Sequence, residues 1–205
     1  MEGDRPAPTS DERVRAVLQA GDVGQAVTDL LRSLGPEVFG FLRGALGNDG
    51  DADEVFAATS ERLWRSLATF RWQCTLRTWT YVIARHEVVR FLQGERRHKV
   101  GRVTTSALEE VVAAVRTETL SALRSEKKSK VKALRDELPV DDRTLLILRV
   151  DRNLQWEEIA HAFLPDVDSP TEEEIRREAA RLRKRFQIIR KRLADRAREE
   201  GLLPR

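Results

Sequence analysis

The chain has 205 residues, of which 35% are charged and 40% hydrophobic, enough for one ordinary domain or two small ones. Its single cysteine, Cys74, excludes an intramolecular disulfide and fits a reducing cytoplasm, and the sequence contains neither a secretory signal nor an apolar run of membrane-spanning length. Residues 1–60 carry 5 Lys/Arg against 11 Asp/Glu, whereas residues 61–205 carry 32 against 23. We therefore expect a cytoplasmic protein whose basic part binds a polyanion and whose acidic part binds another protein.

The first hundred residues show helical periodicity. Residues 1–22 begin with a polar stretch that contains prolines, and we expect them to be a flexible tail. Apolar residues then recur at steps of three and four from Val27 to Leu46. Gly35 and Pro36 are expected to kink or split this helix.

Two further helices complete the first predicted domain, which spans residues 23–99. Asp51 is a suitable N-cap for the first of them, and Glu54 stands three residues on, where it closes a capping box. A polar loop at 71–75 precedes the next helix, expected from Leu76 to Gln93.

A linker at residues 100–133, with a helix of its own, is expected to lead to a second domain at 134–200. This domain starts with an apolar helix for which Asp141 is a possible N-cap. A short helix follows at 155–162, and the last helix starts at Thr171 with three glutamates in its first turn, where the helix dipole favours acids. The sequence therefore predicts an all-α protein of two small helical domains joined by a partly helical linker.

The inventory of reactive residues argues against an enzyme. The three histidines, His86, His98 and His161, do not pair with Cys74 or with each other at metal-ligand spacing. The chain also lacks a glycine-rich phosphate loop and a nucleophile elbow. We expect no catalytic residue, no metal site and no cofactor.

The strongest candidate for binding is the last helix. Residues 176–198 contain 11 Lys/Arg against 2 Asp/Glu. Leu182, Phe186, Ile189 and Leu193 form an apolar stripe on its opposite side. A helix with one buried stripe and one basic face can enter the major groove of DNA, and a short helix followed by such a helix is the order of a helix-turn-helix.

Two blocks of sequence carry a resemblance to a known family. Residues 138–160 (LPVDDRTLLILRVDRNLQWEEIA) resemble region four of bacterial RNA polymerase sigma factors of the extracytoplasmic-function (ECF) class. Residues 51–54 (DADE) and 70–92 (FRWQCTLRTWTYVIARHEVVRFL) resemble region two of the same class. The resemblance covers residues 27–99 and 134–197 and implies an alternative sigma factor, which binds core RNA polymerase and directs promoter recognition, promoter melting and transcription initiation.

The resemblance assigns two sites to the first domain. The helix that follows Asp51 would dock on the coiled coil of the largest polymerase subunit through Asp51, Asp53, Glu54, Glu61, Arg62, Trp64 and Arg65. The loop and the next helix would bind the opened −10 element through Arg71, Trp72, Gln73, Cys74, Thr75, Arg77, Thr78, Arg85, His86 and Arg90. Unpaired bases offer faces for stacking and edges for hydrogen bonds, which Trp72 and Gln73 could supply. The family often has Gly at the Trp72 position and Asn at the His86 position.

The second domain would bind the duplex −35 element and the flap of the polymerase. The −35 contacts would come from Arg177, Arg181, Arg183, Lys184 and Arg185. Residues 169–178 are an insertion relative to the family, and they either extend the last helix or lengthen the turn before it. An anti-sigma factor is a possible further partner.

Two other functions remain open from the residues alone. A stand-alone helix-turn-helix regulator would explain the C-terminal block but leaves the match at 51–92 unexplained. A helical scaffold or anti-sigma-like interaction protein would require the basic face of the last helix to be incidental.

Overall fold

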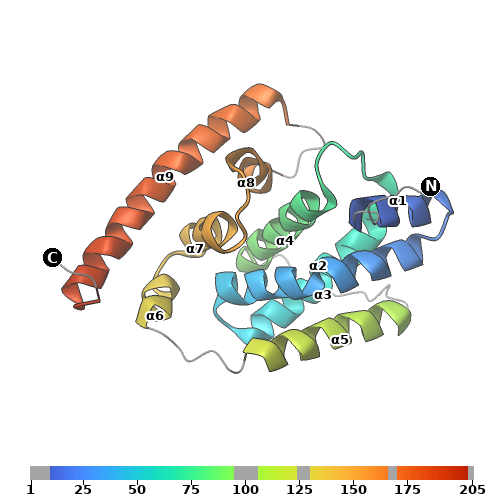
Figure 1. Ribbon diagram of the computed structural model, residues 1–205, viewed down its shortest axis with the longest axis horizontal. Coiled ribbons are helices and arrows are strands. Elements are labelled where there is room, and N and C mark those ends of the chain that lie inside the picture. The colour runs from blue at the N-terminus through green and yellow to red at the C-terminus, as the bar shows by residue number, and fades with distance from the viewer. Residues whose placement is uncertain (1–9, 95–105, 124–129, 166–169, 203–205) are drawn as a thin grey trace, which may run out of the picture.

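The computed structural model describes residues 10–94, 106–123, 130–165 and 170–202, and every regular element in these ranges is helical (Figure 1). In chain order the elements are α1 (Ser10–Gln19), α2 (Val23–Leu46), α3 (Asp49–Ser66), η1 (Leu67–Thr69), α4 (Leu76–Leu92), α5 (Ser106–Leu123), α6 (Lys130–Asp136), α7 (Val140–Leu146), η2 (Ile147–Asp151), α8 (Trp156–Phe163) and α9 (Glu172–Glu199). The predicted all-α class is confirmed. Residues 1–9, 95–105, 124–129, 166–169 and 203–205 lie outside the described residues, and they include parts of the predicted tail, first domain, linker and insertion.

Helix α2 is the centre of an N-terminal group formed by α1 to α5. It begins after Asp22, whose carboxylate accepts a hydrogen bond from Gln25 N (2.8 Å), and ends at Gly47, whose φ of 74° suits a residue without Cβ. Pro36 lies inside this 24-residue helix, so the expectation that the helix would split there is wrong. Buried residues on both sides of the proline, such as Leu31 and Phe39, stabilise the continuous helix through tertiary packing.

Two predicted helix starts are corrected by the caps that the structure shows. The N-cap of α3 is Asn48, whose Oδ1 accepts hydrogen bonds from Gly50 N (2.7 Å) and Asp51 N (3.3 Å). Asp51 therefore lies in the first turn, because the chain leaves α2 at Gly47 and Asn48 is the first residue that can cap the next helix. Likewise α7 begins directly after Pro139, so Asp141 lies in its first turn.

Helix α1 occupies part of the segment predicted to be a flexible tail. It packs along α2, and its Val14 is 1% exposed within the core. A short apolar stripe is thus enough to dock ten residues whose composition is otherwise polar.

Helix α5 lies in the predicted linker and is part of the N-terminal group. Leu108, Val111, Val112 and Val115 are buried, and α5 packs against α2 and α3 (Figure 1). A Cβ built on Gly35 would lie 2.9 Å from Val115 Cγ1, so the glycine lets the two helices approach closely.

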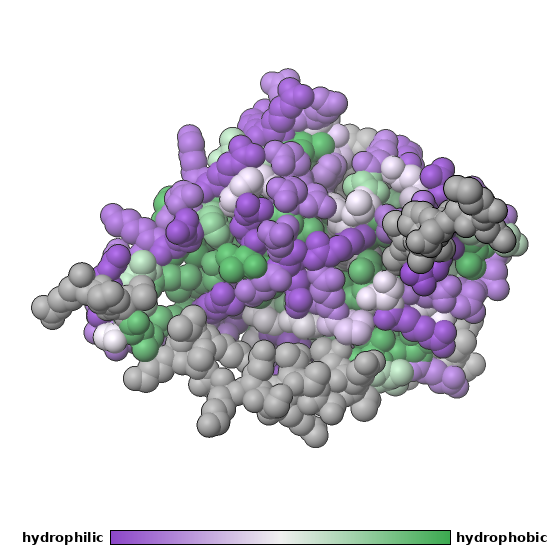
Figure 2. Space-filling model, viewed as in Figure 1, coloured by the Kyte–Doolittle hydropathy of each residue, from purple (hydrophilic) through white to green (hydrophobic). Residues whose placement is uncertain are grey.

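Helices α6 to α9 form a C-terminal group that packs directly on the N-terminal group. Helix α7 contacts α2 and α8 contacts α4, so one hydrophobic core runs through both groups. Helix α9 crosses the outside of α7 and α8, with the predicted apolar stripe facing inward (Figure 1). The face seen in Figure 2 is largely hydrophilic along α9. Within the described ranges, no helix combines the length and apolarity needed to cross a membrane, and no group of acidic, His and Cys residues is arranged to hold a metal ion.

Candidate nucleic-acid interface

The loop between η1 and α4 is built on three aromatic side chains. Phe70 packs against both Trp72 and Trp79, with ring centroids 5.0 and 4.6 Å apart. Thr75 ends the loop as the N-cap of α4, and its Oγ1 accepts a hydrogen bond from Thr78 N (3.1 Å). The packing and the cap together give the loop a defined shape.

Trp72 has a left-handed backbone conformation, with φ of 57°. Such angles are uncommon for a bulky side chain and favour glycine. Glycine is also the residue often found at this position in the family that the sequence resembles. Two contacts hold Trp72 there: the Phe70 ring on one side and the Arg15 guanidinium, 5.1 Å from the centre of the indole ring. The Trp72 side chain is thus half-buried in packing rather than projecting freely as a stacking platform.

Helix α1 also reaches the first residue of α4. The backbone N–H of Leu76 donates a hydrogen bond to Asp11 Oδ2 (3.1 Å), across 65 positions of sequence. One of the free N–H groups at the start of α4 is thereby satisfied by a carboxylate from α1. Sequence reasoning missed Asp11 and Arg15 because nothing in their local pattern indicates contact with the loop.

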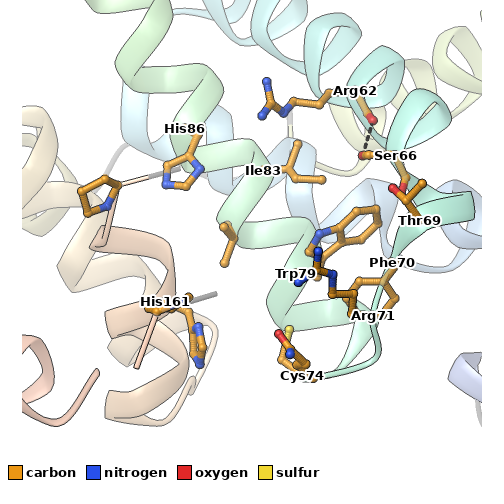
Figure 3. Close-up of a pocket in the computed structure, with 14 residues that line it drawn as sticks. Arg62, Ser66, Thr69, Phe70, Arg71, Cys74, Trp79, Ile83, His86 and His161 are labelled. Atoms are coloured by element: carbon orange, nitrogen blue, oxygen red, sulfur yellow. Dashed lines mark hydrogen bonds between the residues drawn. The ribbon is translucent and has the colours of Figure 1, made fainter. Parts of the chain in front are cut away.

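A cavity of about 250 Å³ opens beside this loop (Figure 3). Its lining includes four residues of the predicted −10 set: Arg71, Gln73, Cys74 and His86. The remaining wall includes Trp79 of α4 and, from the C-terminal group, His161, Pro165 and Pro170. Figure 3 shows His86 and His161 on the side of the cavity opposite Trp79 and Arg71.

Burial changes the acid–base behaviour of two side chains in the cavity wall. It raises the pKa of the Cys74 thiol to about 11, and the nearby carboxylates of Glu158 and Asp11 act in the same direction. Burial also lowers the pKa of His161, which favours its neutral form. Cys74 therefore remains a protonated thiol near neutral pH.

Polar side chains of α4 that are predicted to bind DNA form hydrogen bonds within the protein. The Arg77 guanidinium donates to Glu37 (3.2 Å from Nε to Oε1) and to the Arg152 carbonyl (2.8 Å). Thr78 Oγ1 donates to Glu158 Oε1 (2.6 Å) and is 1% exposed.

Further along α4 the same holds for Arg85 and His86. The Arg85 guanidinium binds Asp141 (3.0 Å) and lies 4.0 Å from the centre of the Phe163 ring. The Leu164 carbonyl accepts a hydrogen bond from His86 Nε2 (2.9 Å). Arg90, by contrast, pairs within α4 with Glu87 (3.2 Å). The structure thus gathers the predicted −10 residues on one loop and one helix, but the C-terminal group contacts four of them.

Glu37 is the carboxylate that binds Arg77, and its surroundings favour its charged form. Burial opposes ionisation of this carboxylate, yet hydrogen bonds from Arg77 and Tyr81 outweigh it and lower the pKa of Glu37. Burial raises the pKa of Tyr81, so its hydroxyl stays protonated and donates to Glu37 Oε1 (2.7 Å). Sequence reasoning missed Glu37, which looked like an ordinary polar position of α2.

The residues predicted to dock on the polymerase differ in accessibility along α3. Glu54 and Arg65 are exposed, whereas Asp51, Asp53, Glu61, Arg62 and Trp64 are partly buried. Asp53 accepts two hydrogen bonds from Arg116 of α5, one of them 2.7 Å long. Trp64 lies against the first turn of α2, where a Cβ on Gly24 would be 3.1 Å from its ring.

The five residues of α9 that are predicted to bind the −35 element point in two directions. Arg183 pairs with Glu157 of α8 (3.1 Å) and Arg185 with Asp142 of α7 (2.5 Å), so both lie on the flanks that face the C-terminal group. Arg177, Arg181 and Lys184 are exposed on the side opposite the buried stripe. Arg185 does not share their face, although its spacing of four from Arg181 suggests it, because its side chain turns to the buried Asp142.

Two further residues extend this outward face of α9. Lys191 is exposed at a step of seven from Lys184, and Ile188 between them is 62% exposed. We call Arg177, Arg181, Lys184, Ile188 and Lys191 the outward face. Sequence reasoning missed Ile188 and Lys191, although the spacing of seven from Arg177 through Lys184 to Lys191 would have found the lysine.

The described part of the insertion extends α9 rather than lengthening the turn. Thr171 caps the helix, and a capping box joins its Oγ1 to Glu174 N (3.3 Å) and its backbone N–H to Glu174 Oε2 (2.8 Å). Helix α9 therefore starts at Glu172, about two and a half turns before Arg181.

A protein-family model matches part of the chain. Residues 30–98 match the family model described as Sigma-70 region 2, a match that includes α3, the 71–75 loop and α4. This family consists of non-enzymatic transcription initiation factors. No curated protein matches the chain. Residues 30–98 are thus similar to a Sigma-70 region 2 domain, and this similarity supports a sigma-factor role in RNA polymerase binding and promoter recognition.

Proposed function

We propose that the chain is an alternative sigma factor of the ECF class, a cytoplasmic binding protein without catalytic activity of its own. The observation that carries the proposal is the Sigma-70 region 2 match, because it covers α3, the 71–75 loop and α4 together. In this proposal α3 docks on core RNA polymerase, with Glu54 and Arg65 as its exposed charges.

The −10 element would be read by the loop and its cavity. A cavity of about 250 Å³, bordered by Trp79 and by the polar groups of Arg71 and Gln73, combines an aromatic wall with hydrogen-bonding partners. These are the two kinds of contact that hold an extruded base. The Arg71 and Gln73 side chains are exposed and can meet DNA without any rearrangement of the loop.

The −35 element would be read by the outward face of α9. It carries four cations and one apolar side chain on a long helix whose other side is buried. Cations on such a face bind phosphates, and an apolar side chain can contact the methyl group of thymine in the major groove.

The direct test uses purified protein, core RNA polymerase and a pool of random double-stranded DNA. Selection of bound DNA followed by transcription of the selected fragments should yield specific transcripts that require the protein. Tight duplex binding without polymerase, and no transcript, would favour a stand-alone regulator instead. Polymerase binding without any DNA preference would favour a scaffold.

A pair of variants tests α9 as the duplex reader. Arg177→Ala/Lys184→Ala should weaken binding of the selected −35 duplex and reduce the slope of log K against log salt by about 2, one for each lost phosphate contact. Arg176→Ala/Arg190→Ala removes the same charge from exposed positions off the outward face. Equal losses in both variants would assign the effect to net charge and count against the outward face.

A further inference from the structure

The cavity beside the 71–75 loop combines aromatic, apolar and cationic side chains in one lining (Figure 3). One part of the wall is aromatic and aliphatic and consists of Phe70, Trp79, Val82 and Ile83. Arg62 and Arg71 add two cations, and among the residues that the structure describes the lining includes no aspartate or glutamate. Aromatic surface beside positive charge, without a competing carboxylate in the wall, favours a ligand that joins a flat ring to an anionic group.

Of the two cations, Arg71 is the better placed to hold an anion. Arg62 Nη1 lies 3.9 Å from Glu87 Oε1, and Glu87 is fully buried, so part of the Arg62 charge is balanced within the protein. Arg71 is exposed on the loop, where it lines the cavity and is also accessible to solvent. A planar guanidinium binds a carboxylate through two parallel hydrogen bonds, which fix both the position and the orientation of the anion.

The rest of the lining supplies neutral contacts. Burial lowers the pKa of His161, so its ring is predominantly uncharged at neutral pH. His86 Nε2 lies 2.9 Å from the Leu164 carbonyl oxygen, and Pro165 and Pro170 add apolar surface. The volume of about 250 Å³ is just below the range of about 300–1,000 Å³ for drug-sized ligands, so the cavity suits one or two fused rings with a single charged group.

We propose that this cavity binds a small aromatic carboxylate, whose ring lies against Trp79 and whose anionic group pairs with Arg71. The binding itself concerns only this chain. Its effect on DNA rests on the proposed function, in which Arg71, Gln73 and Trp79 hold a base of the −10 element. A bound carboxylate would occupy the same contacts and make the chain responsive to a free small molecule. At ten times its Kd, it should weaken binding of the −10 strand about 11-fold.

The test is isothermal titration calorimetry of the full-length protein with three compounds. 2-Naphthoate has the ring and the charge, 2-naphthamide has the ring alone, and cyclohexanecarboxylate has the charge without an aromatic ring. We expect 2-naphthoate to bind at least about tenfold more tightly than either of the others, because only 2-naphthoate makes both the ring contact and the charge-assisted hydrogen bonds.

Two variants locate the binding in the cavity. Arg71→Ala should weaken binding of 2-naphthoate at least about fivefold and leave binding of 2-naphthamide unchanged. Val82→Phe fills part of the cavity but keeps Arg71, and it should weaken binding of both compounds at least about fivefold, with an unchanged circular dichroism spectrum. Arg32→Ala is the matched control, because it removes the same charge from an exposed position of α2 outside the lining, and it should bind like the wild type.

Equal affinities for 2-naphthoate and 2-naphthamide, or wild-type affinity in both cavity variants, would overturn the site even if promoter-specific transcription were intact. Tighter binding of thymidine 5′-monophosphate than of 2-naphthoate would assign the cavity to a nucleotide and overturn the carboxylate. The effect on DNA is measured with core polymerase and a fluorescent single strand that carries the −10 sequence of a selected promoter. Cavity-dependent binding of 2-naphthoate that leaves the affinity for this strand unchanged would uphold the ligand site and contradict the proposed place of the −10 base.

Discussion

The docking of α5 on the N-terminal group leads to a prediction of definite size. Leu108 is 1% exposed, on a helix that the sequence placed in a linker. Leu108→Ala should destabilise the protein by about 2–5 kcal/mol, because it removes buried methyl groups and leaves a cavity. For a chain of this length that corresponds to a fall in Tm of about 4–20 °C, at about 2–4 °C per kcal/mol.

The assay is urea and thermal unfolding followed by circular dichroism, with Glu110→Ala as the control. Glu110 is exposed on α5, so its replacement should change stability by no more than about 0.5 kcal/mol. If α5 were an undocked linker helix, Leu108→Ala would also be close to neutral, since leucine and alanine have similar helix propensities. A change below about 0.5 kcal/mol at Leu108 would therefore refute the packing argument.

Three other perturbations test contacts described above. Thr171→Ala removes the N-cap of α9 and should cost about 1 kcal/mol in urea unfolding at pH 7, and a cost near zero would contradict the cap. Hydrogen bonds from Thr171 lower the pKa of Glu174, so the part of this cost that comes from the hydroxyl–carboxylate bond should be lost as the pH falls below about 4.5 through that lowered pKa, while the bond from Glu174 N to Thr171 Oγ1 remains. Glu37→Gln should lower Tm at pH 7 and make Tm less dependent on pH in the acid range. The pKa of Glu37 is lowered in the folded protein, so the charged carboxylate stabilises the fold above its unfolded pKa and ceases to do so as it protonates. Parallel curves of Tm against pH for the two proteins would count against this. Arg15→Ala removes a cation–π contact worth about 0.5–1 kcal/mol. It should reduce promoter opening, measured by permanganate reactivity, more than it reduces polymerase binding. Equal loss of both would mean that α1 does not position the loop.

The sequence predicted most of the helices because their periodicity and caps are local. The inward stripe of α9 at Leu182, Phe186 and Ile189 is confirmed by their burial, and Thr171 caps that helix where the glutamates of the first turn indicated. The cap of α3 was assigned to Asp51 instead of Asn48, since both are good N-caps and only the exit of the chain at Gly47 decides between them.

Contacts between segments that lie far apart in the sequence were not predicted from it. The pairing of Arg85 with Asp141 and of Thr78 with Glu158 joins residues 56 and 80 positions apart, and no local pattern records such a pair. The same holds for Asp11 at the start of α4. Arg85 and Thr78 are predicted to bind DNA, and in this structure their hydrogen-bond partners are carboxylates of the protein.

The length of α9 gives it the properties of a lever. Its 28 residues make a rod of about 42 Å. Its far end packs against α6, and Arg196 lies 3.6 Å from Glu137, the residue that follows α6. A tilt of about 10° about the Thr171 end would move the far end by about 7 Å, roughly the separation of two phosphates along one strand. The packing of α6 against this end therefore adds to the buried stripe in fixing the direction of α9, and with it the direction of the outward face.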